Sequence, residues 1–394
     1  MPALPPRPVA LIEADGLVLA AALVAPGELP RFTNAAMDGF ALRSADTLRA
    51  PARLQVVGRC RAGAPFEGSV QPGEAVAIAT GAALPMGADT IAPIEEVQQW
   101  GAAILVPDTL EPGRHVRSAG EDVAAGQVLV ERGIVVGPGQ LAAAAALGFA
   151  SVFVHPRPRV AILPTGDEIQ PAGSRLGPGE TYDAVSVALA VLLAEAGAVP
   201  MVTPPVVDEP GALMGALGAA ARDADAILTT GGVSVGDRDL LPRLFGPVAV
   251  QGFRVALRPA RPFAFGTAFG TPLFCLPGNP ASALAAFEEL VRPAVLGMLG
   301  KPPVLRPALR AVLGESLPGS PGSLHLVRAA VWRDGSRLCA RSAGRQGAGM
   351  MHSLAGANAW AIIPSGTSEL PAGSVVDVRM LGAVWDCDPT SLPR

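Results

Sequence analysis

The stretch TTGGVSVGDRDLL, residues 229–241, has the composition of an anion-binding loop. Gly231, Gly232 and Gly236 allow close backbone approach, and Ser234 adds a hydroxyl beside main-chain amide donors. Phosphate or another oxyanion is the ligand that this composition favours. The stretch matches neither a P-loop nor a dinucleotide fingerprint. An ordinary glycine-rich turn after a strand is the alternative.

A second anion-binding candidate is LPGNPASAL, residues 276–284, in which a rigid turn precedes a predicted helix. The turn consists of Pro277, Gly278, Asn279 and Pro280.

Three arginines lie just upstream, Arg254, Arg258 and Arg261 in FRVALRPARPFAF. If this segment is extended, Arg254 and Arg258 lie on the same face, because strand side chains repeat every second residue. Three cations near two such turns favour a phosphorylated or doubly anionic ligand. A solvated basic edge strand is the alternative.

Several acids lie beside Gly or Pro at predicted loop tips: Asp38 in NAAMDGF, Asp122 in AGEDVAAG, Glu168 in TGDEI, Asp208 in VVDEP and Asp239 in GDRD. Any one of them alone is ordinarily a solvated turn residue. If they converge on one basic pocket, they can hold Mg²⁺, which needs only one or two protein oxygens. The histidines have no metal-ligand spacing, and no Ser-His-Asp constellation can be assigned.

The composition limits the class of protein. The chain has 394 residues, enough for two to four domains, and its net charge of -4 without a dense basic run argues against a nucleic-acid groove. Its apolar stretches are interrupted before the roughly 20 residues that a bilayer crossing needs. The prolines near the N-terminus do not suit a signal peptide, and the four cysteines are widely spaced. We therefore expect a soluble, cytoplasmic protein with no membrane partner.

The elements that must position these residues change in type along the chain. Residues 7–25 predict a helix followed by a short strand. Short apolar segments between about 50 and 108 predict a small β-domain or barrel, and GQLAAAAALGFA predicts an alanine-rich helix. The expected domains are 1–49 with 109–155 as one discontinuous linker domain, 50–108 as an inserted β-domain, 156–300 as an α/β domain, and 301–394 as a C-terminal β-domain.

Strands and helices alternate from residue 156, which predicts a doubly wound α/β domain with a mostly parallel sheet. The strands are RPRVAILP, VPMVTPPVV and DAILTT, and the helices are VSVALAVLLAEAGA and GALMGALGAAARDA. Ligands of such sheets bind beyond the carboxyl ends of the strands. The motifs TGDEI, VVDEP and TTGGVSVGDRD all fall at that edge.

Seven motifs in this order resemble the molybdopterin molybdenumtransferase family, known as MoeA in bacteria and as the gephyrin E-domain in animals. They are NAAMDGFALR, IATGAALPMGADTIAPIEEV, VRSAGEDVAAGQVL, VAILPTGDEI, TTGGVSVGDRD, LPGNPASA and AGMMHSLAGANAWAIIPSG. The resemblance covers nearly the whole chain. It implies a central molybdopterin-binding, MogA-like α/β domain.

The family's enzymes insert molybdenum from molybdate into adenylylated molybdopterin and release AMP, with Mg²⁺ assistance, in molybdenum cofactor biosynthesis. The resemblance implies catalytic roles for Asp38, Asp122, Glu168, Asp208 and Asp239, with Glu168 and Asp239 as metal ligands. It implies binding roles for Thr80, Gly231, Gly232, Ser234, Arg254, Arg258, Arg261, Pro277, Gly278, Asn279 and Pro280.

The resemblance also implies partners. The expected assembly is a homodimer in which the α/β domain of one chain faces the Asp38 and Asp122 loops of the other. A molybdopterin adenylyltransferase, molybdoenzymes and cofactor-delivery proteins are the other expected partners.

Four features depart from the family pattern. They are arginine for lysine at positions 258 and 261, Ala260 for glycine, Ala184-Val185-Ser186 where Asn-Ser usually follows Tyr-Asp, and Ala348 where serine is common. They leave open a non-catalytic or altered paralogue that binds molybdopterin or molybdenum cofactor for storage or delivery. A partner-binding scaffold and an adenylyltransferase are weaker alternatives, since the chain lacks a long linker and has two β-domains beside the α/β domain.

Overall fold

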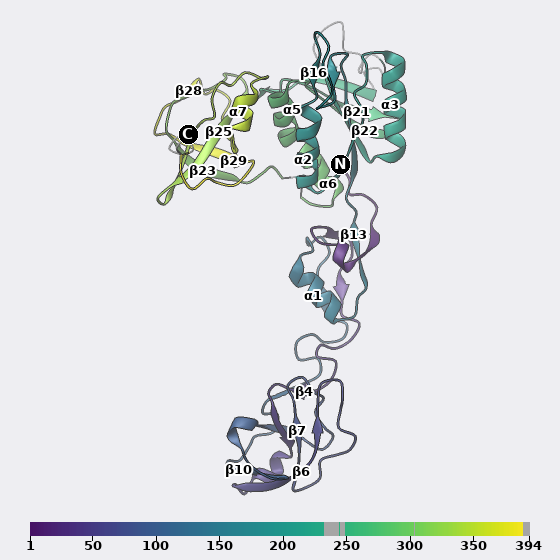
Figure 1. Ribbon diagram of the computed structural model, residues 1–394, viewed down its shortest axis with the longest axis vertical. Coiled ribbons are helices and arrows are strands. Elements are labelled where there is room, and N and C mark those ends of the chain that lie inside the picture. Colours follow the sequence, from purple (N-terminus) through teal and green to yellow (C-terminus); the bar gives the residue numbers. More distant parts are fainter. Residues whose placement is uncertain (232–243, 245–248, 303, 389–394) are drawn as a thin grey trace. The chain divides into compact units, whose positions relative to one another are not determined.

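The computed structural model describes residues 1–231, 244, 249–302 and 304–388. These residues form two compact units, one of Pro8–Val154 and one of Met1–Arg7 with His155–Arg394 (Figure 1).

A six-stranded sheet of order β8-β5-β7-β6-β10-β9 dominates the Pro8–Val154 unit. Its strands are β5 (Gly39–Leu42), β6 (Ala52–Cys60), β7 (Glu74–Ile78), β8 (Thr90–Pro93), β9 (Gln98–Trp100) and β10 (Ala103–Val106). Buried side chains alternate with exposed ones at the start of β6, and two hydrophobic clusters cover the sheet. The predicted β-rich insert is therefore present. The sheet also includes β5, which precedes residue 50, and the expected domain boundaries stay a prediction.

The rest of this unit is built from short strands and one helix. They are β1 (Arg7–Ala10), β2 (Val18–Leu19), β3 (Leu23–Val24), β4 (Asn34–Ala35), β11 (Val116–Arg117), β12 (Val128–Val130), β13 (Ser151–His155) and α1 (Pro138–Ala146), with 3-10 turns at Leu11–Glu13, Ser44–Thr47 and Ile94–Glu96. The strands pair as β1-β13-β2, β11-β4 and β12-β3. Helix α1 confirms the predicted alanine-rich helix.

The helix predicted within residues 7–25 is wrong. Only a 3-10 turn, Leu11–Glu13, lies between the strands there. The main-chain N–H of Leu11 donates to the carbonyl of Ala150, and that of Ala20 donates to the carbonyl of Phe153. Backbone pairing with distant residues has thus overridden the local helical pattern.

The α/β domain is a six-stranded sheet between helices. The strands are β14 (Arg159–Pro164), β17 (Val199–Val202), β18 (Ala226–Thr230), β19 (Val250–Arg254), β21 (Pro262–Ala268) and β22 (Thr271–Leu276), in the order β17-β14-β18-β22-β21-β19. The first four in this order pair in parallel, and β21 and β19 are antiparallel to their neighbours. The predicted, mostly parallel α/β domain is confirmed.

Helices cover both faces of this sheet. They are α2 (Val185–Ala196), α3 (Pro210–Asp223), α5 (Pro280–Ala286) and α6 (Arg292–Met298), with a π turn at Phe287–Val291 between the last two. Figure 1 shows α3 on one side of the sheet and α2, α5 and α6 on the other. Leu213, Leu217 and Ala220 form the buried stripe of α3 against the sheet. Gly197, with a φ of 99°, ends α2 in the left-handed conformation that favours glycine.

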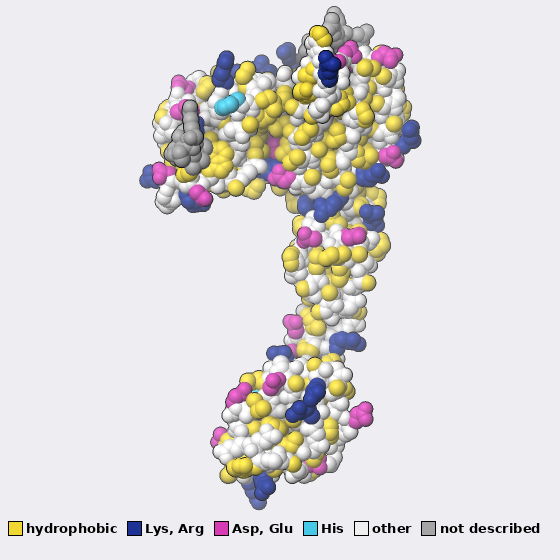
Figure 2. Space-filling view, in the orientation of Figure 1, with side chains coloured by type: hydrophobic (Ala, Val, Ile, Leu, Met, Phe, Trp, Pro, Cys, Tyr) yellow, Lys and Arg dark blue, Asp and Glu magenta, His cyan; other side chains and the backbone are white. Residues whose placement is uncertain are grey.

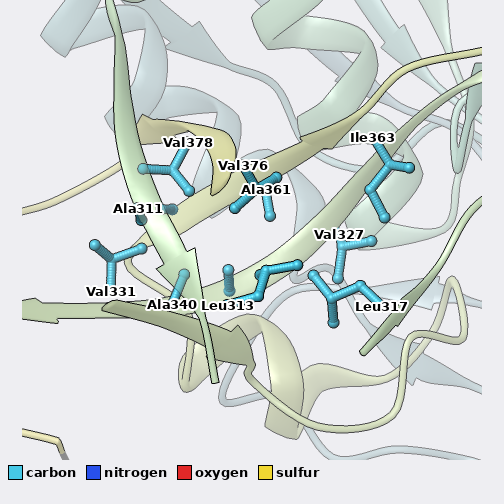
Figure 3. Close-up of a cluster of buried hydrophobic side chains, with 12 residues drawn as sticks. Ala311, Leu313, Leu317, Val327, Val331, Ala340, Ala361, Ile363, Val376 and Val378 are labelled. Carbon is cyan, nitrogen blue, oxygen red and sulfur yellow. The ribbon is translucent and has the colours of Figure 1, made fainter. Parts of the chain in front are cut away.

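The C-terminal domain is a small barrel. Its strands are β20 (Leu257–Arg258), β23 (Ala308–Leu313), β25 (Leu324–Asp334), β26 (Arg337–Ser342), β27 (Ala359–Ile363) and β29 (Val375–Met380), in the order β20-β25-β26-β23-β29-β27, and β25 also pairs with β27. Alternate residues of β25, Val327, Ala329 and Val331, belong to the shared core. Figure 3 shows Val327 and Val331 in it. Short pairs β15 (Ile169–Gln170) with β16 (Thr181–Tyr182) and β24 (Leu317–Pro318) with β28 (Glu369–Leu370), and helix α7 (Met351–Ala355), complete the described elements.

Two further observations concern the predictions about nucleic-acid binding and about crossing a bilayer. On the face shown in Figure 2, Lys and Arg side chains are scattered among acidic, apolar and uncharged ones. No described helix has the length and hydropathy that crossing a bilayer requires.

Candidate functional site

A cavity of about 590 Å³ opens at the carboxyl ends of the parallel strands of the α/β domain. Its walls come from several segments: Thr165, Glu168, Ile169, Thr181, Tyr182, Asp183, Ala184, Val185, Thr230, Gly231, Pro262, Pro277, Gly278, Asn279, Pro280, Gly349 and Met351. Of the residues predicted from sequence, Glu168, Gly231, Pro277, Gly278, Asn279 and Pro280 are brought together here. The expected location beyond the strand ends is where the cavity lies.

Backbone hydrogen bonds fix the floor of the cavity. The N–H of Thr165, after β14, donates to the carbonyl of Thr230 at the end of β18 over 3.0 Å. The N–H of Gly231 donates to the carbonyl of Leu276 at the end of β22, also over 3.0 Å. Three neighbouring strands therefore hold their terminal residues in register at one edge.

Gly231 is required by this geometry. Its φ is 97°, and a Cβ added there would lie 2.8 Å from the carbonyl oxygen of Thr165. A Cβ on Gly278 would instead lie 3.5 Å from the Cα of Gly231, an ordinary contact. Gly231 is therefore a place where another backbone segment approaches closely, and its role toward an anion stays a prediction.

The Pro277–Pro280 turn differs from the sequence expectation in one respect. The sequence predicts an anion site at the start of the following helix, where main-chain amides are ordinarily free. The N–H of Ala281 instead donates to the carbonyl of Ala348, from the C-terminal domain, over 3.2 Å. Asn279 makes no side-chain capping bond to α5, and its side chain lines the cavity.

The start of α2 forms another wall, where the sequence indicates Ala184 and Val185 only as departures from the family pattern, not as site residues. Asp183 accepts a hydrogen bond from the N–H of Ser186, in the first turn of α2, over 2.9 Å, and Asp183 and Val185 line the cavity. The sequence does contain a signal for this helix start, because an aspartate just before an apolar helical run predicts a helix N-terminus. Gly349 and Met351 come from the C-terminal domain, and no local signal places them in this cavity.

Acidic side chains gather beside the cavity. The N–H of Asp208 donates to Oδ1 of Asp167 over 3.0 Å. Partial burial raises the pKa of the Asp208 carboxyl, and the negative charges of Asp167 and Glu168 raise it further. The charge of Glu168 therefore acts on Asp208, the acid that was expected to function with it. A cation bound among these carboxylates would relieve their repulsion.

The three arginines are exposed at the surface, and none of them lines the cavity. The segment is not one extended strand: β19 ends at Arg254, while β20, which contains Arg258, pairs with β25 of the barrel. The proposed common face of Arg254 and Arg258 is therefore wrong. Arg261 directly precedes Pro262, which does line the cavity. All three arginines remain proposed ligand-binding residues.

Asp38, Thr80 and Asp122 lie in the other compact unit. Oδ1 of Asp38 accepts hydrogen bonds from the hydroxyl and the N–H of Thr80, each 2.7 Å long. The hydroxyl first, and then the N–H, hold the pKa of the Asp38 carboxyl below its ordinary value. Asp122 is exposed, and its N–H donates to the carbonyl of Leu29.

Replacing Thr80 by valine is expected to raise the pKa of Asp38, because the variant removes the hydroxyl and keeps the main-chain donor. A carboxyl-detected NMR titration of the whole protein measures this. Thr80→Ser keeps the hydroxyl and is the matched control. A Thr80→Val protein whose Asp38 titrates as in the unaltered protein would contradict the assigned cause.

Three predicted residues, Gly232, Ser234 and Asp239, lie outside the described residues. Within the described ranges, no group of three or more His, Cys, Asp or Glu side chains is arranged to hold a metal ion. This finding is compatible with Mg²⁺, which needs only one or two carboxylates.

Comparison with known proteins identifies the family. Residues 2–148 match the MoeA N-terminal region (domain I and II), residues 161–297 a probable molybdopterin binding domain, and residues 310–381 the MoeA C-terminal region (domain IV). The chain is 37% identical over 392 residues to molybdopterin molybdenumtransferase 2 of Mycobacterium tuberculosis strain H37Rv, covering 97% of this chain and 95% of the relative. The chain belongs to the MoeA family.

Two further proteins agree with this MoeA assignment. The molybdopterin molybdenumtransferase of Bacillus subtilis strain 168 is 33% identical, over 96% of this chain and 91% of its own. The crystal structure of the molybdopterin biosynthesis MoeA protein from Pyrococcus horikosii superposes with a TM-score of 0.83 at 30% identity, covering 97% and 95% of the two chains. The resemblance inferred from the seven motifs and the expected multidomain architecture are both confirmed.

Proposed function

We propose that this MoeA-family protein is a molybdopterin molybdenumtransferase, which inserts molybdenum from molybdate into adenylylated molybdopterin and releases AMP. The observation that carries the proposal is the cavity at the strand ends, into which the TGDEI, TTGG and LPGNP motifs all contribute residues. Its volume of about 590 Å³ suits a small-molecule ligand. Relatives that match along nearly the whole chain bear this enzyme's name.

The residues of the cavity have distinct roles in this proposal. Opening a phosphoanhydride requires positioning and charge neutralisation more than covalent help from the protein. Gly231 and the Pro277–Pro280 turn form rigid walls that orient the substrate. Glu168 accepts a proton from, or orients, an attacking oxygen. Outside the cavity walls, we propose that Arg254, Arg258 and Arg261 provide cations for pyrophosphate or molybdate, and that Gly232 and Ser234 belong to the anion-binding loop.

Mg²⁺ fits the chemistry of the acids beside the cavity. The raised pKa of Asp208 reflects partial burial and the charges of Asp167 and Glu168, and these are conditions that favour a bound cation. We propose Glu168 and Asp239 as its ligands. When bound, the ion would neutralise phosphate charge.

We propose a cytoplasmic homodimer in which the Asp38, Thr80 and Asp122 loops complete the site of the partner subunit. A molybdopterin adenylyltransferase is the expected source of the nucleotide substrate, and molybdoenzymes or delivery proteins are the expected recipients of the product. Sedimentation at micromolar concentration tests the assembly. A protein that stays monomeric there would contradict the shared site.

The transferase proposal is tested by AMP release from purified adenylylated molybdopterin, with and without molybdate and Mg²⁺. Release from the unaltered protein is expected to depend on molybdate, and Glu168→Gln is expected to slow it by about 100-fold or more, the effect of removing a general acid or base. Glu209→Gln is the matched control, because Glu209 is exposed near Asp208 and does not line the cavity.

Two outcomes would overturn parts of this proposal. An unaltered protein that binds the nucleotide but releases no AMP would favour the storage or delivery paralogue, which the names of the relatives do not favour. An active Glu168→Gln protein would remove Glu168 from the chemistry and leave the transferase function in place.

A further inference from the structure

The cavity has walls from two domains of the same compact unit. Most of its residues belong to the α/β domain, while Gly349 and Met351 belong to the C-terminal segment that contains the barrel. The bond from the Ala281 N–H to the Ala348 carbonyl joins these walls directly. The shape of the cavity therefore depends on how the barrel is oriented on the α/β domain.

A partly buried ion pair joins the same two domains, and neither of its residues lines the cavity. Glu289 lies in the π turn Phe287–Val291, and its carboxylate pairs with the guanidinium of Arg379 on β29 of the barrel. The two side chains are 9% and 15% exposed. The cavity and its mechanism, as proposed, use neither residue.

The position of Glu289 in the chain connects this ion pair to the cavity. The π turn directly follows α5, which starts at Pro280 in the cavity wall. The cavity-lining turn therefore lies at the start of one helical segment. The residue that pairs with the barrel lies near the middle of the same segment. The Ala281 bond and the Glu289–Arg379 pair hold the barrel at two separate points along this segment.

The energetics make the ion pair selective for one orientation. A largely desolvated carboxylate that loses its cation is disfavoured, because water replaces the partner only in part. A barrel rotated on the α/β domain would separate Arg379 from Glu289, and the favourable energy of this partly buried ion pair would be lost. A buried ion pair with a geometric requirement can thus act as a registry device between two packed parts.

We propose that Glu289 and Arg379 are positioning residues, whose ion pair fixes the barrel in the orientation that brings Gly349 and Met351 into the cavity. This inference rests on the proposed function for its effect on substrate. The effect on orientation is independent of that function.

The experiment compares Glu289→Gln, Arg379→Met and the charge exchange Glu289→Arg with Arg379→Glu. Arg341→Met is the matched control, because Arg341 pairs with Asp388 within the C-terminal domain. Spin labels at Val199→Cys in the α/β domain and Ser336→Cys in the barrel, with Cys339 and Cys387 changed to serine, report the distance between the domains. Thermal unfolding and the steady-state kinetics of AMP release are measured on the same proteins without labels.

Both single variants are expected to broaden or shift the distance distribution and to raise KM for adenylylated molybdopterin about tenfold or more, with a smaller change in kcat. The charge exchange is expected to narrow the distribution again and to lower KM. Arg341→Met is expected to change neither. Glu289→Gln preserves the side-chain shape, so it keeps the test open if Arg379→Met does not fold.

An unaltered distance distribution in folded Glu289→Gln would overturn the proposal, even if its melting temperature falls. So would a shifted distribution with an unchanged KM, since the orientation would then not matter for the cavity. If the unaltered protein releases no AMP, the proposed function fails, while the distance measurement still tests the positioning role.

Discussion

Replacing Arg306 by methionine is expected to lower the free energy of unfolding by about 3–5 kcal/mol, the cost of removing the main partner of a buried ion. Arg292 stays within 4.0 Å of Glu288 as a weaker partner. The guanidinium of Arg306 donates from Nε and Nη2 to the carboxylate of Glu288, over 2.8 and 2.9 Å. The Glu288 side chain is only 4% exposed. In Arg306→Met the Glu288 carboxylate stays largely desolvated and has lost its main partner.

Arg306 also makes two hydrogen bonds to Glu195, of 2.6 and 3.0 Å. The Glu195 side chain is 46% exposed, so solvent screens this contact and we assign most of the loss to Glu288. Burial opposes the charged form of Arg306, but its bonds to Glu195 and Glu288 outweigh this and raise its pKa above the ordinary value.

The Arg306 effect should depend on pH in a defined direction. The hydrogen bond from Arg306 holds the pKa of Glu195 below its ordinary value of 4.5. A carboxyl whose pKa is lowered in the folded state stabilises that state at pH values above its ordinary pKa. This stabilisation is lost as the pH falls through the folded-state pKa. The difference between the unaltered protein and Arg306→Met should therefore be largest near neutral pH and should shrink in acid.

Urea unfolding of both proteins, from neutral pH down through the folded-state pKa of Glu195, measures this difference in the free energy of unfolding. Arg310→Met is the matched control, because Arg310 is an exposed residue of the neighbouring strand β23 and should change stability by less than about 0.5 kcal/mol. An equal loss in the two variants would show that the buried Glu288 contact is not its cause.

Replacing Gly231 by alanine is expected to destabilise the α/β domain by roughly 2–4 kcal/mol, combining left-handed backbone strain with a steric clash. The φ of 97° disfavours any side chain, and the new Cβ would lie 2.8 Å from the carbonyl oxygen and 3.0 Å from Oγ1 of Thr165. The backbone of Thr165 is tied to Thr230 by a hydrogen bond, so it cannot move away without breaking the floor of the cavity.

Thermal unfolding and nucleotide binding are both measured. Gly231→Ala is expected to have a lower melting temperature and a lower affinity for the nucleotide than the unaltered protein. Gly278→Ala is the matched control for stability within the same cavity, since its Cβ would make an ordinary 3.5 Å contact. We expect it to melt close to the unaltered protein. Equal melting temperatures for the two variants would contradict the geometric requirement at Gly231.

The sequence by itself determined the elements of the α/β domain and the edge at which its motifs meet. Alternating strands and helices from residue 156 were predictable because apolar periodicity is a local property of the chain. The meeting of Glu168, Gly231 and Pro277 followed from a topological rule, since residues after parallel strands share one edge of the sheet.

Local patterns were misleading where pairing across long sequence distances decided the structure. Residues 7–25 have a helical pattern, but the N–H groups of Leu11 and Ala20 bond to residues near position 150. Arg254 and Arg258 look like one strand in sequence, but they belong to strands of two different sheets. Periodicity contains no information about such partners.

Only the tertiary structure decided which distant segments complete the cavity. Gly349 and Met351 enter it because the barrel docks beside α5, and the amide of Ala281 is occupied by Ala348 for the same reason. The Glu289–Arg379 and Glu288–Arg306 pairs join residues 90 and 18 positions apart. The free energy of burying these charges depends on the docked arrangement as a whole, so no single stretch of sequence could reveal it.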